Sequence, residues 1–276
     1  MTAFRETERI SQQEPRGQGD IIKIEWRGNE DGPQYGVVIN ADCDLAWGRT
    51  DGVIAFVPLY SFYDYLALFW ASGHVQNVVS TETAAVLQLA GDSDSEALHE
   101  WIRLSGANEV SCSIKKYKSL KKKEAEKLER SLRHLAICLD HSQTYIARFR
   151  SICAVASDPS AYARTQIANA KKALGDGHFF ISDLVDDPSV GFVVRLRRIY
   201  TLPEQDCFIS ISDQMARSEG DRVTAARVAR LTERYRFKIL QLFAQQYSRI
   251  GLNDDVTALS DLAVEDLVEK ITGEKN

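Results

Sequence analysis

The residues with the most distinctive chemistry form the short element Asp42-Cys43-Asp44, which directly follows an apolar, strand-like run. Its carboxylates could bind a divalent cation through hard oxygen ligands, and Cys43 could act as a nucleophile. The element alone supplies too few ligands for a metal, and the nearest histidine in the sequence is His74. The structural alternative is a turn in which both carboxylates accept backbone N–H bonds while Cys43 points into the core. The pattern favours the structural turn. If the element is instead a functional site, contact with a partner is favoured over catalysis.

A group of arginines forms the second candidate site. Arg195 and Arg197 alternate along a run expected to be a strand, which would place them on one face of it. Arg227, Arg230 and Arg234 recur at steps of three and four residues, which would place them along one side of a helix. Guanidinium groups suit recognition of phosphate or carboxylate. The same arginines could instead pair with the chain's own 39 acidic residues, and both interpretations stay open.

Other catalytic or metal-binding patterns are sparse. The sequence contains no GxSxG, HExxH, GxxxxGK[ST] or GxGxxG motif, and His134 and His141 lie on one expected helix face without a third ligand nearby. The basic run at residues 115–123 is followed at once by glutamates, which favours a solvated, ion-paired helix face over a nucleic-acid patch. We therefore predict no metal and no cofactor.

Composition limits the classes of protein that fit. The chain has 276 residues, 44% of them hydrophobic and 26% charged, which is typical of a folded globular protein. Its net charge of −5 gives no general attraction to nucleic acid or to anionic membranes, so any such binding requires a local patch. The sequence shows neither an apolar run of membrane-spanning length nor a secretory signal, and its five cysteines form no CxxC pair. These features predict a cytoplasmic protein with reduced thiols and no membrane partner.

The elements that would position these residues begin with strands. Alternating or continuous apolar runs at 21–26, 35–40 and 53–59 predict three closely spaced antiparallel strands, as in a small barrel. Residues 1–18 lack periodicity and are expected to be a mobile leader. The barrel-like part is thus expected to start with residues 19–61.

Helical periodicity then dominates residues 62–177, with the longest expected helix between residues 114 and 156 and a further helix opened by Asp158-Pro159. Strand patterns return at 178–184, 191–200 and 207–211, within a second β segment at 178–215. These strands could complete the first sheet, with the helices as an insertion, or form a second small sheet. Residues 221–272 are predicted to form two C-terminal helices, 222–250 and 255–272.

The runs GDIIKIEW, YGVVINAD and GVIAFVPLYS, within residues 19–61, resemble the opening of the MazF/PemK (Kid) toxin family. That family consists of small SH3-like barrels, many of which cleave RNA, with an arginine–proline pair before the second strand and a Ser or Thr after the third. The matching positions here are Tyr35 and Gly36 for the pair and Ser61 for the hydroxyl. A barrel without that arginine lacks the group that would neutralise charge on a transferring phosphoryl group.

We therefore expect an α+β protein with a small SH3-like or MazF-like barrel, a large helical insertion and C-terminal helices. The resemblance implies a non-catalytic module that binds a protein partner, in a bacterial toxin–antitoxin or antiviral defence system. One alternative is a MazF-like endoribonuclease in which Ser61 would act, and another is a nucleic-acid-binding protein that uses the arginine-rich face. The sequence leaves the oligomeric state and the identity of the partner open.

Overall fold

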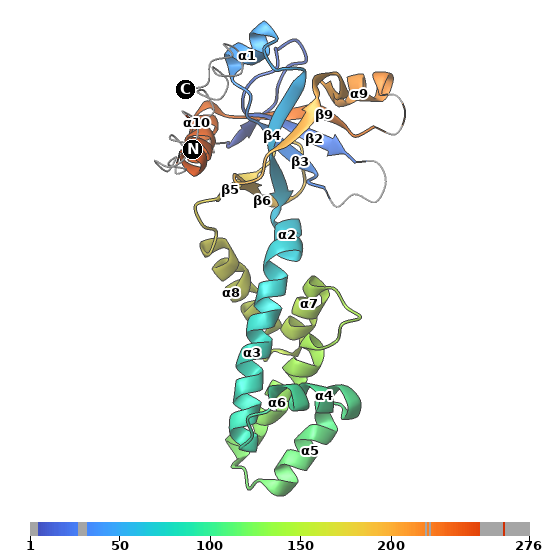
Figure 1. Ribbon diagram of the computed structural model, residues 1–276, viewed down its shortest axis with the longest axis vertical. Helices are drawn as coiled ribbons and strands as arrows, with labels where there is room; N and C mark the ends of the chain where they lie inside the picture. The colour runs from blue at the N-terminus through green and yellow to red at the C-terminus, as the bar shows by residue number, and fades with distance from the viewer. Residues whose placement is uncertain (1–4, 27–31, 219, 221, 249–261, 263–276) are drawn as a thin grey trace. The chain divides into compact units, whose positions relative to one another are not determined.

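A computed structural model describes residues 5–26, 32–218, 220, 222–248 and 262. Over these residues the chain is a mixed α and β structure whose strands form a nearly closed, mainly antiparallel barrel (Figure 1). It divides into two compact units. We call residues 1–58, 176–179 and 194–276 the barrel unit, and residues 59–175 and 180–193 the helical unit.

The described strands belong to one sheet. They are β1 (Thr7–Glu8), β2 (Asp20–Glu25), β3 (Tyr35–Val38), β4 (Val53–Ser61), β5 (His178–Asp183), β6 (Val190–Arg195), β7 (Tyr200–Pro203), β8 (Cys207–Phe208) and β9 (Thr224–Leu231). The order is β1-β9-β2-β3-β4-β6-β5, while β7 pairs with β4 and β8 pairs in parallel with β9. The three early strands predicted from the sequence are confirmed, and the later β runs join the same sheet rather than forming a second one.

The core of the barrel unit forms where β2, β3, β4 and β9 cross. Its side chains are mostly branched aliphatic residues, which suit a pleated, buried surface, together with Phe56 at its centre. The Phe56 ring stacks on Tyr200, with ring centroids 5.6 Å apart. Gly36 of β3 lies directly against this ring, since a Cβ placed there would come within 2.3 Å of Phe56 Cδ2. The absence of a side chain at position 36 therefore makes room for the central aromatic residue.

The predicted helix at 222–250 is wrong in its first part, because residues 224–231 form strand β9. Ala225, Ala226 and Ala229 are completely buried there, and β9 pairs antiparallel with β2 along its length. Alanine favours helices in isolation, but pairing with neighbouring strands overrides that preference. The helix α10 begins only at Glu233 and ends at Tyr247. The second predicted C-terminal helix, 255–272, lies outside the described residues except for position 262.

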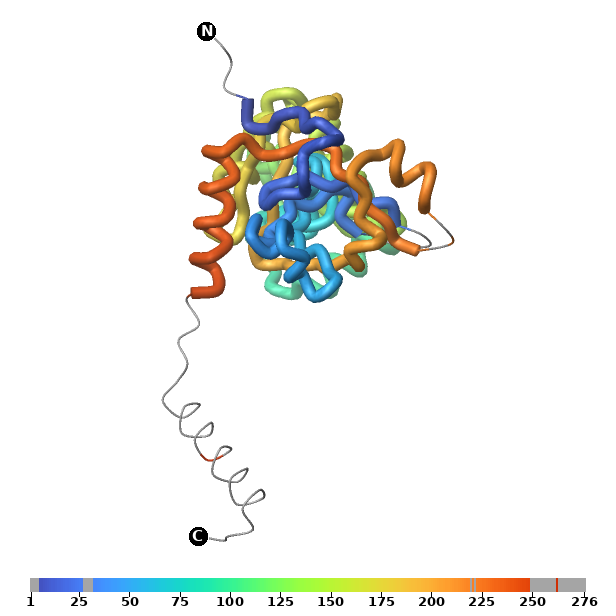
Figure 2. Tube along the Cα trace, turned by 90° about the horizontal axis from the view of Figure 1, so that it is seen from above, coloured from blue at the N-terminus to red at the C-terminus, as the bar shows by residue number. Residues whose placement is uncertain are grey.

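A mobile leader is expected at residues 1–18, but residues 5–18 contact the barrel through β1 and through Arg227, while residues 1–4 lie outside the described residues. β1 pairs with the end of β9, where Thr7 is opposite Leu231. In Figure 2 the start of the described chain (dark blue) and the segment that leads into α10 (orange to red) accordingly lie side by side. Helices α1 (Asp42–Trp47) and α9 (Ile211–Arg217) and the short 3-10 helix η2 (Glu204–Asp206) complete this unit.

The helical unit contains more and shorter helices than the sequence predicts. They are α2 (Phe62–Tyr65), the π-helix η1 (Leu66–Trp70), α3 (Ala71–Ala90), α4 (Ser95–Ser105), α5 (Ala107–Tyr117), α6 (Lys122–Cys138), α7 (Tyr145–Val155) and α8 (Pro159–Lys172). The long helix expected at 114–156 is therefore wrong, because the backbone breaks after α5 and again after α6. The predicted helix start at Asp158-Pro159 is confirmed, with the Asp158 carboxylate accepting the N–H of Ala161.

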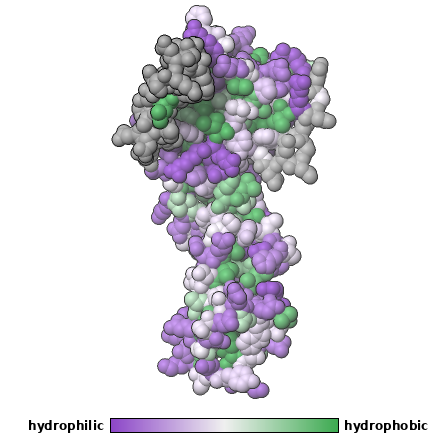
Figure 3. Space-filling view, viewed as in Figure 1, coloured by the Kyte–Doolittle hydropathy of each residue, from purple (hydrophilic) through white to green (hydrophobic). Residues whose placement is uncertain are grey.

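The core of the helical unit is built from α6 packed on α3 and α5. Leu128, Leu132 and Leu135 recur at the spacing of one helix face and are completely buried. Hydrophilic side chains cover much of the visible surface of these helices, with small hydrophobic areas between them (Figure 3). Lys115 forms an ion pair with Glu129, as expected of an ion-paired rather than a nucleic-acid-binding basic run. Within the described ranges, no helix has the length and hydropathy needed to cross a membrane.

Candidate functional site

The acidic-thiol element forms the first turn of α1 rather than a loop. The Asp42 carboxylate accepts the backbone N–H of Gln18 at 2.7 Å and lies 3.4 Å from the guanidinium of Arg236 on α10. Asp42 thus fastens α1 to two other segments of the barrel unit. Cys43 is exposed, so the expectation that it points into the core is wrong. The Asp44 carboxylate accepts a contact from the Cys43 thiol at 3.6 Å, and from no backbone N–H in the described chain.

These contacts predict unequal effects for the two carboxylates. We expect Asp42→Ala to lower the free energy of unfolding by about 1 kcal/mol, because the N–H of Gln18 loses its acceptor. Asp44→Ala should change it by less than about 0.5 kcal/mol, as is usual for a surface position. Thermal melting of both variants checks this. If Asp44→Ala lowers the free energy of unfolding more than Asp42→Ala does, the first turn of α1 depends on Asp44 and the prediction is wrong.

Arg227 and Arg230 lie inside the barrel unit instead of on an exposed helix face. Asp20 is almost fully buried, and its carboxylate lies 3.5 Å from Arg227 Nη1 and 2.5 Å from Arg230 Nε. Arg227 also donates to the carbonyls of Ser11, Glu14 and Pro15 at 2.9–3.1 Å. The internal-pairing interpretation is confirmed for both arginines. Their contacts hold the N-terminal segment on the barrel.

Three other sequence candidates are dispersed. Ser61 caps the N-terminus of α2, where its hydroxyl accepts the N–H of Asp64 and donates to the Asp64 carboxylate. Arg195 ends β6, whereas Arg197 lies in the following turn and donates to Gln246 on α10 at 2.9 Å. The predicted alternation of Arg195 and Arg197 on one strand face is therefore wrong, because the strand ends between them.

Arg234 is different, because it lies on an exposed face of α10. Arg234, Lys238 and Gln241 recur at the spacing of one helix face and line a pocket of about 840 Å³. The lining is completed by three aromatic residues, Phe179, Tyr235 and Phe237. We call the whole lining of this pocket the α10 face. The rings of Phe179 and Tyr235 meet edge to face, with centroids 6.3 Å apart. Among the described residues, no carboxylate lies within ion-pair distance of Arg234 or Lys238.

The most accessible aromatic group of the α10 face is Phe237, whose side chain is 57% exposed. The guanidinium of Arg236 lies over its ring, 5.2 Å from the centroid. Arg234 and Lys238 line the same pocket as this exposed ring, and Asp42 balances the charge of Arg236. An exposed ring beside unpaired cations can stack on a planar group and bind an anion next to it.

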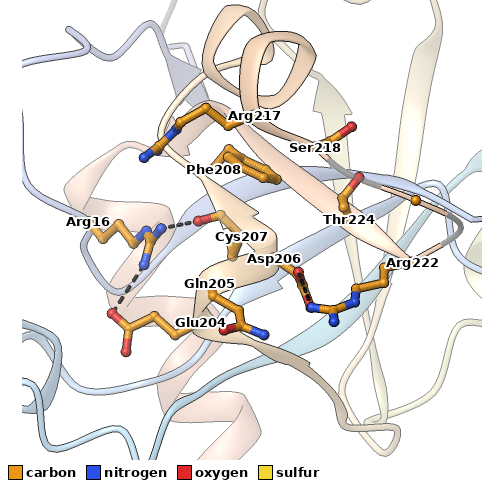
Figure 4. Close-up of a pocket in the computed structure, with 11 residues that line it drawn as sticks. Arg16, Glu204, Gln205, Asp206, Cys207, Phe208, Arg217, Ser218, Arg222 and Thr224 are labelled. Carbon is orange, nitrogen blue, oxygen red and sulfur yellow. Dashed lines mark hydrogen bonds and ion pairs between the residues drawn. The ribbon is translucent and has the colours of Figure 1, made fainter.

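A second cavity of the barrel unit is lined mainly by polar residues, but their charges are balanced. It measures about 790 Å³ and lies between residues 204–208, α9 and the start of β9 (Figure 4). In Figure 4 Arg16 points toward Glu204 and the Cys207 carbonyl, and Arg222 points toward Asp206. Arg217, also labelled in Figure 4, pairs at 2.5 Å with Asp213, which the close-up does not draw. Every arginine of this cavity therefore already has a carboxylate partner, which weakens its attraction for an external anion.

Cys207 in the same cavity is poorly suited to nucleophilic chemistry. Burial is the main influence on its thiol and raises the pKa to about 11, against a smaller lowering by Arg16. A thiol with that pKa is protonated at neutral pH, whereas the thiolate is the reactive form. Among the described residues, no cluster of three or more His, Cys, Asp or Glu side chains could hold a metal ion.

Arg234 is among the site residues predicted from the sequence, whereas the aromatic residues of the α10 face are not. The available signal is the run Arg-Tyr-Arg-Phe-Lys at 234–238, which interleaves basic and aromatic residues. The helical spacing of Arg227, Arg230 and Arg234 obscures this signal, because the first two residues belong to β9 and only Arg234 belongs to α10. Phe179 carries no such signal, since only the fold brings β5 to α10.

Comparison with family models, with curated proteins and with solved structures finds no match to this chain.

Proposed function

We propose that this protein is a binding module, and that its barrel unit binds single-stranded nucleic acid on the α10 face. The observation that carries the proposal is the pairing of an exposed ring, Phe237, with two unpaired cations, Arg234 and Lys238, along one helix face. Proteins that bind single strands combine these groups, since bases stack on aromatic side chains while basic residues follow the phosphates.

The charge of the whole chain does not oppose this proposal. Although the net charge is −5, the cations of α10 are concentrated within two turns, and electrostatic attraction is screened beyond about 8–10 Å at moderate salt. Bases in a duplex are stacked inside it and cannot reach a side-chain ring. We therefore expect single strands to bind more tightly than duplexes, with little dependence on sequence.

The test measures binding of fluorescent single-stranded RNA and DNA oligonucleotides by anisotropy over a range of salt concentrations. Phe237→Ala should weaken binding about 5- to 150-fold, the effect of losing one stacked base, and leave the salt dependence unchanged. Replacing Arg234 and Lys238 together by glutamine should reduce the slope of log K against log salt by about 1.4, or about 0.7 for each lost phosphate contact.

The matched control replaces Lys122 and Lys123 by glutamine, which removes the same charge from the basic run of the helical unit. That variant should bind like the unmodified protein. If the control loses as much affinity as the Arg234 and Lys238 variant, the binding depends on the net charge of the protein and not on the α10 face. Equal affinity for duplex and single strand, together with no effect of Phe237→Ala, would contradict the proposal.

A second candidate is a protein-binding surface on α1, as the sequence analysis favours. The specific observation is Trp47 at the end of this helix, whose side chain is 74% exposed on the same helix as the exposed Cys43. Tryptophan is enriched among residues that dominate protein interfaces. A pulldown from the native host, with mass spectrometry of proteins and sequencing of co-purified RNA, separates the two candidates. Trp47→Ala should abolish capture of a protein partner and leave RNA binding intact.

The toxin-like setting remains a proposal that rests on the resemblance alone. If the protein cleaved RNA like the family, Ser61→Ala would abolish cleavage. The nucleic-acid proposal instead predicts binding without turnover, so that intact oligonucleotide is recovered after prolonged incubation with the protein.

A further inference from the structure

The helical unit contains a cleft that the proposed function does not use. It measures about 650 Å³ and is lined by α3, by α4 and the segment before it, by the end of α6 and the segment after it, and by the start of α7. Exposed residues of α3, among them Gln76, Ser80 and Ala84, lie along it, while Val75 and Cys138 are buried. Its size is within the range of small-molecule sites.

The most unusual lining residue is Arg148 of α7, which is only 5% exposed. One terminal nitrogen donates to the Cys138 carbonyl at 3.1 Å, and the other lies 3.5 Å from His141 Nδ1. Its Nε is buried and has no hydrogen-bond partner. Among the described residues, no carboxylate lies within ion-pair distance of this guanidinium.

Asp140 senses the charge of Arg148, but its carboxylate already has other partners. Its oxygens accept hydrogen bonds from the hydroxyl and backbone N–H of Ser142 and from the Gln143 amide. These bonds, the Ser142 hydroxyl first, lower the pKa of Asp140, and the charge of Arg148 contributes least. Arg148 therefore remains a buried cation without a direct counter-ion, an arrangement that costs free energy unless an anion compensates it.

The rest of the lining fits an organic molecule better than a bare ion. Thr83 Oγ1 and His99 Nε2 lie 2.7 Å apart, and the Tyr145 ring lies 4.9 Å from the carbon of the guanidinium. Burial, and then the charge of Arg103, lower the pKa of His99, which favours the neutral form of its ring. Apolar side chains such as Val79 and Leu87 lie beside these polar groups. A ligand with an anionic head and a partly apolar body would match both parts of the lining.

We propose that this cleft binds a small organic anion, a carboxylate or a phosphate monoester, whose charged group pairs with Arg148. A guanidinium presents a planar fork of donors that matches carboxylate and phosphate oxygens. The body of the ligand lies along α3, between the apolar residues and the hydroxyl groups. This site is separate from the α10 face and does not depend on nucleic-acid binding.

The test uses the full chain with benzoate, hexanoate, phenyl phosphate and inorganic phosphate, and with benzyl alcohol and hexanol as matched neutral probes. Calorimetry gives each Kd, and thermal melting gives the shift in midpoint. At about 100 times its Kd an anionic probe should raise the midpoint by about 5 °C, because it binds the folded state alone. The neutral alcohols should bind at least about 10-fold more weakly, since they lack the charge-assisted hydrogen bonds. The comparison of carboxylates with phosphates identifies the preferred head group.

Two variants assign the binding to the cleft. Arg148→Gln should weaken binding of the anions about 10- to 100-fold. Ser80→Trp places a bulky side chain at an exposed position of the cleft, keeps Arg148 and should also abolish binding. Lys172→Gln, at an exposed position of α8 outside the cleft lining, is the matched control and should bind normally. The proposal is overturned if no anionic probe binds, if the alcohols bind equally well, or if Ser80→Trp binds like the unmodified protein.

Discussion

Replacement of Arg227 by glutamine is expected to lower the free energy of unfolding by about 3–5 kcal/mol, the usual cost of removing one partner from a buried ion pair. The side chain is 3% exposed, and it joins the carboxylate of Asp20 to the carbonyls of Ser11, Glu14 and Pro15. Without it, Asp20 keeps Arg230 and the N–H of Gly17, but the carbonyls lose their donor. Urea unfolding, followed by circular dichroism, measures the loss.

The control for this experiment is Arg222→Gln, because that side chain is 66% exposed and lies 3.9 Å from Asp206. An exposed pair of this kind contributes at most about 1 kcal/mol, so the control should melt close to the unmodified protein. Proteolysis gives an independent readout, since the N-terminal segment should become accessible in Arg227→Gln. If both variants lose the same small amount, the Arg227 contacts do not stabilise the fold.

Replacement of Gly36 by valine is expected to cost about 3 kcal/mol, at the upper end of the usual range for overpacking a core. A Cβ at this position would come within 2.3 Å of Phe56, whose ring is completely buried and stacked on Tyr200. The neighbouring strands cannot move apart without breaking the register in which Gly36 pairs with Ile22. The double variant with Phe56→Leu should recover part of the loss, because the smaller side chain frees volume next to position 36. Thermal and urea unfolding of the single and double variants measure both effects.

Gly73 of α3 supplies a control of opposite sign. Its position is helical, and a Cβ there would meet no atom within 4 Å. Gly73→Ala should therefore raise stability by about 0.5–1 kcal/mol, because alanine loses less conformational freedom in a helix. If Gly73→Ala were destabilising, the loss of stability on replacing a glycine in this protein could not be assigned to a steric clash alone. A neutral Gly36→Val would show that Phe56 has room to move.

Gly36 also bears on the resemblance to toxin barrels. In the resemblance proposed from the sequence, Gly36 would stand where the family has its proline and Tyr35 where it has its arginine, and Tyr35 is 6% exposed here. An arginine and proline could not be introduced here without repacking the Phe56 core.

Local rules predicted those features of this protein that depend on neighbours in the sequence. The strands at 20–25, 35–38 and 53–61 follow from apolar runs bounded by turn residues, and the start of α8 follows from Asp158-Pro159. In each case the determining contacts are short in sequence.

Only the tertiary structure decided the features that depend on distant partners. The segment 224–231 has helical spacing and three alanines, yet it becomes a strand because β2 and β1 pair with it from residues about 200 positions away. That change of element turned Arg227 and Arg230 inward onto Asp20 and left Arg234 on a different, exposed face beside Phe179. In the same way, the uncompensated charge of Arg148 cannot be seen in the sequence, which contains 39 acidic residues that could have paired with it. Hydrogen bonding and burial between distant segments outweigh local propensities of a fraction of a kcal/mol per residue, and they determine which charges are paired and which can bind a ligand.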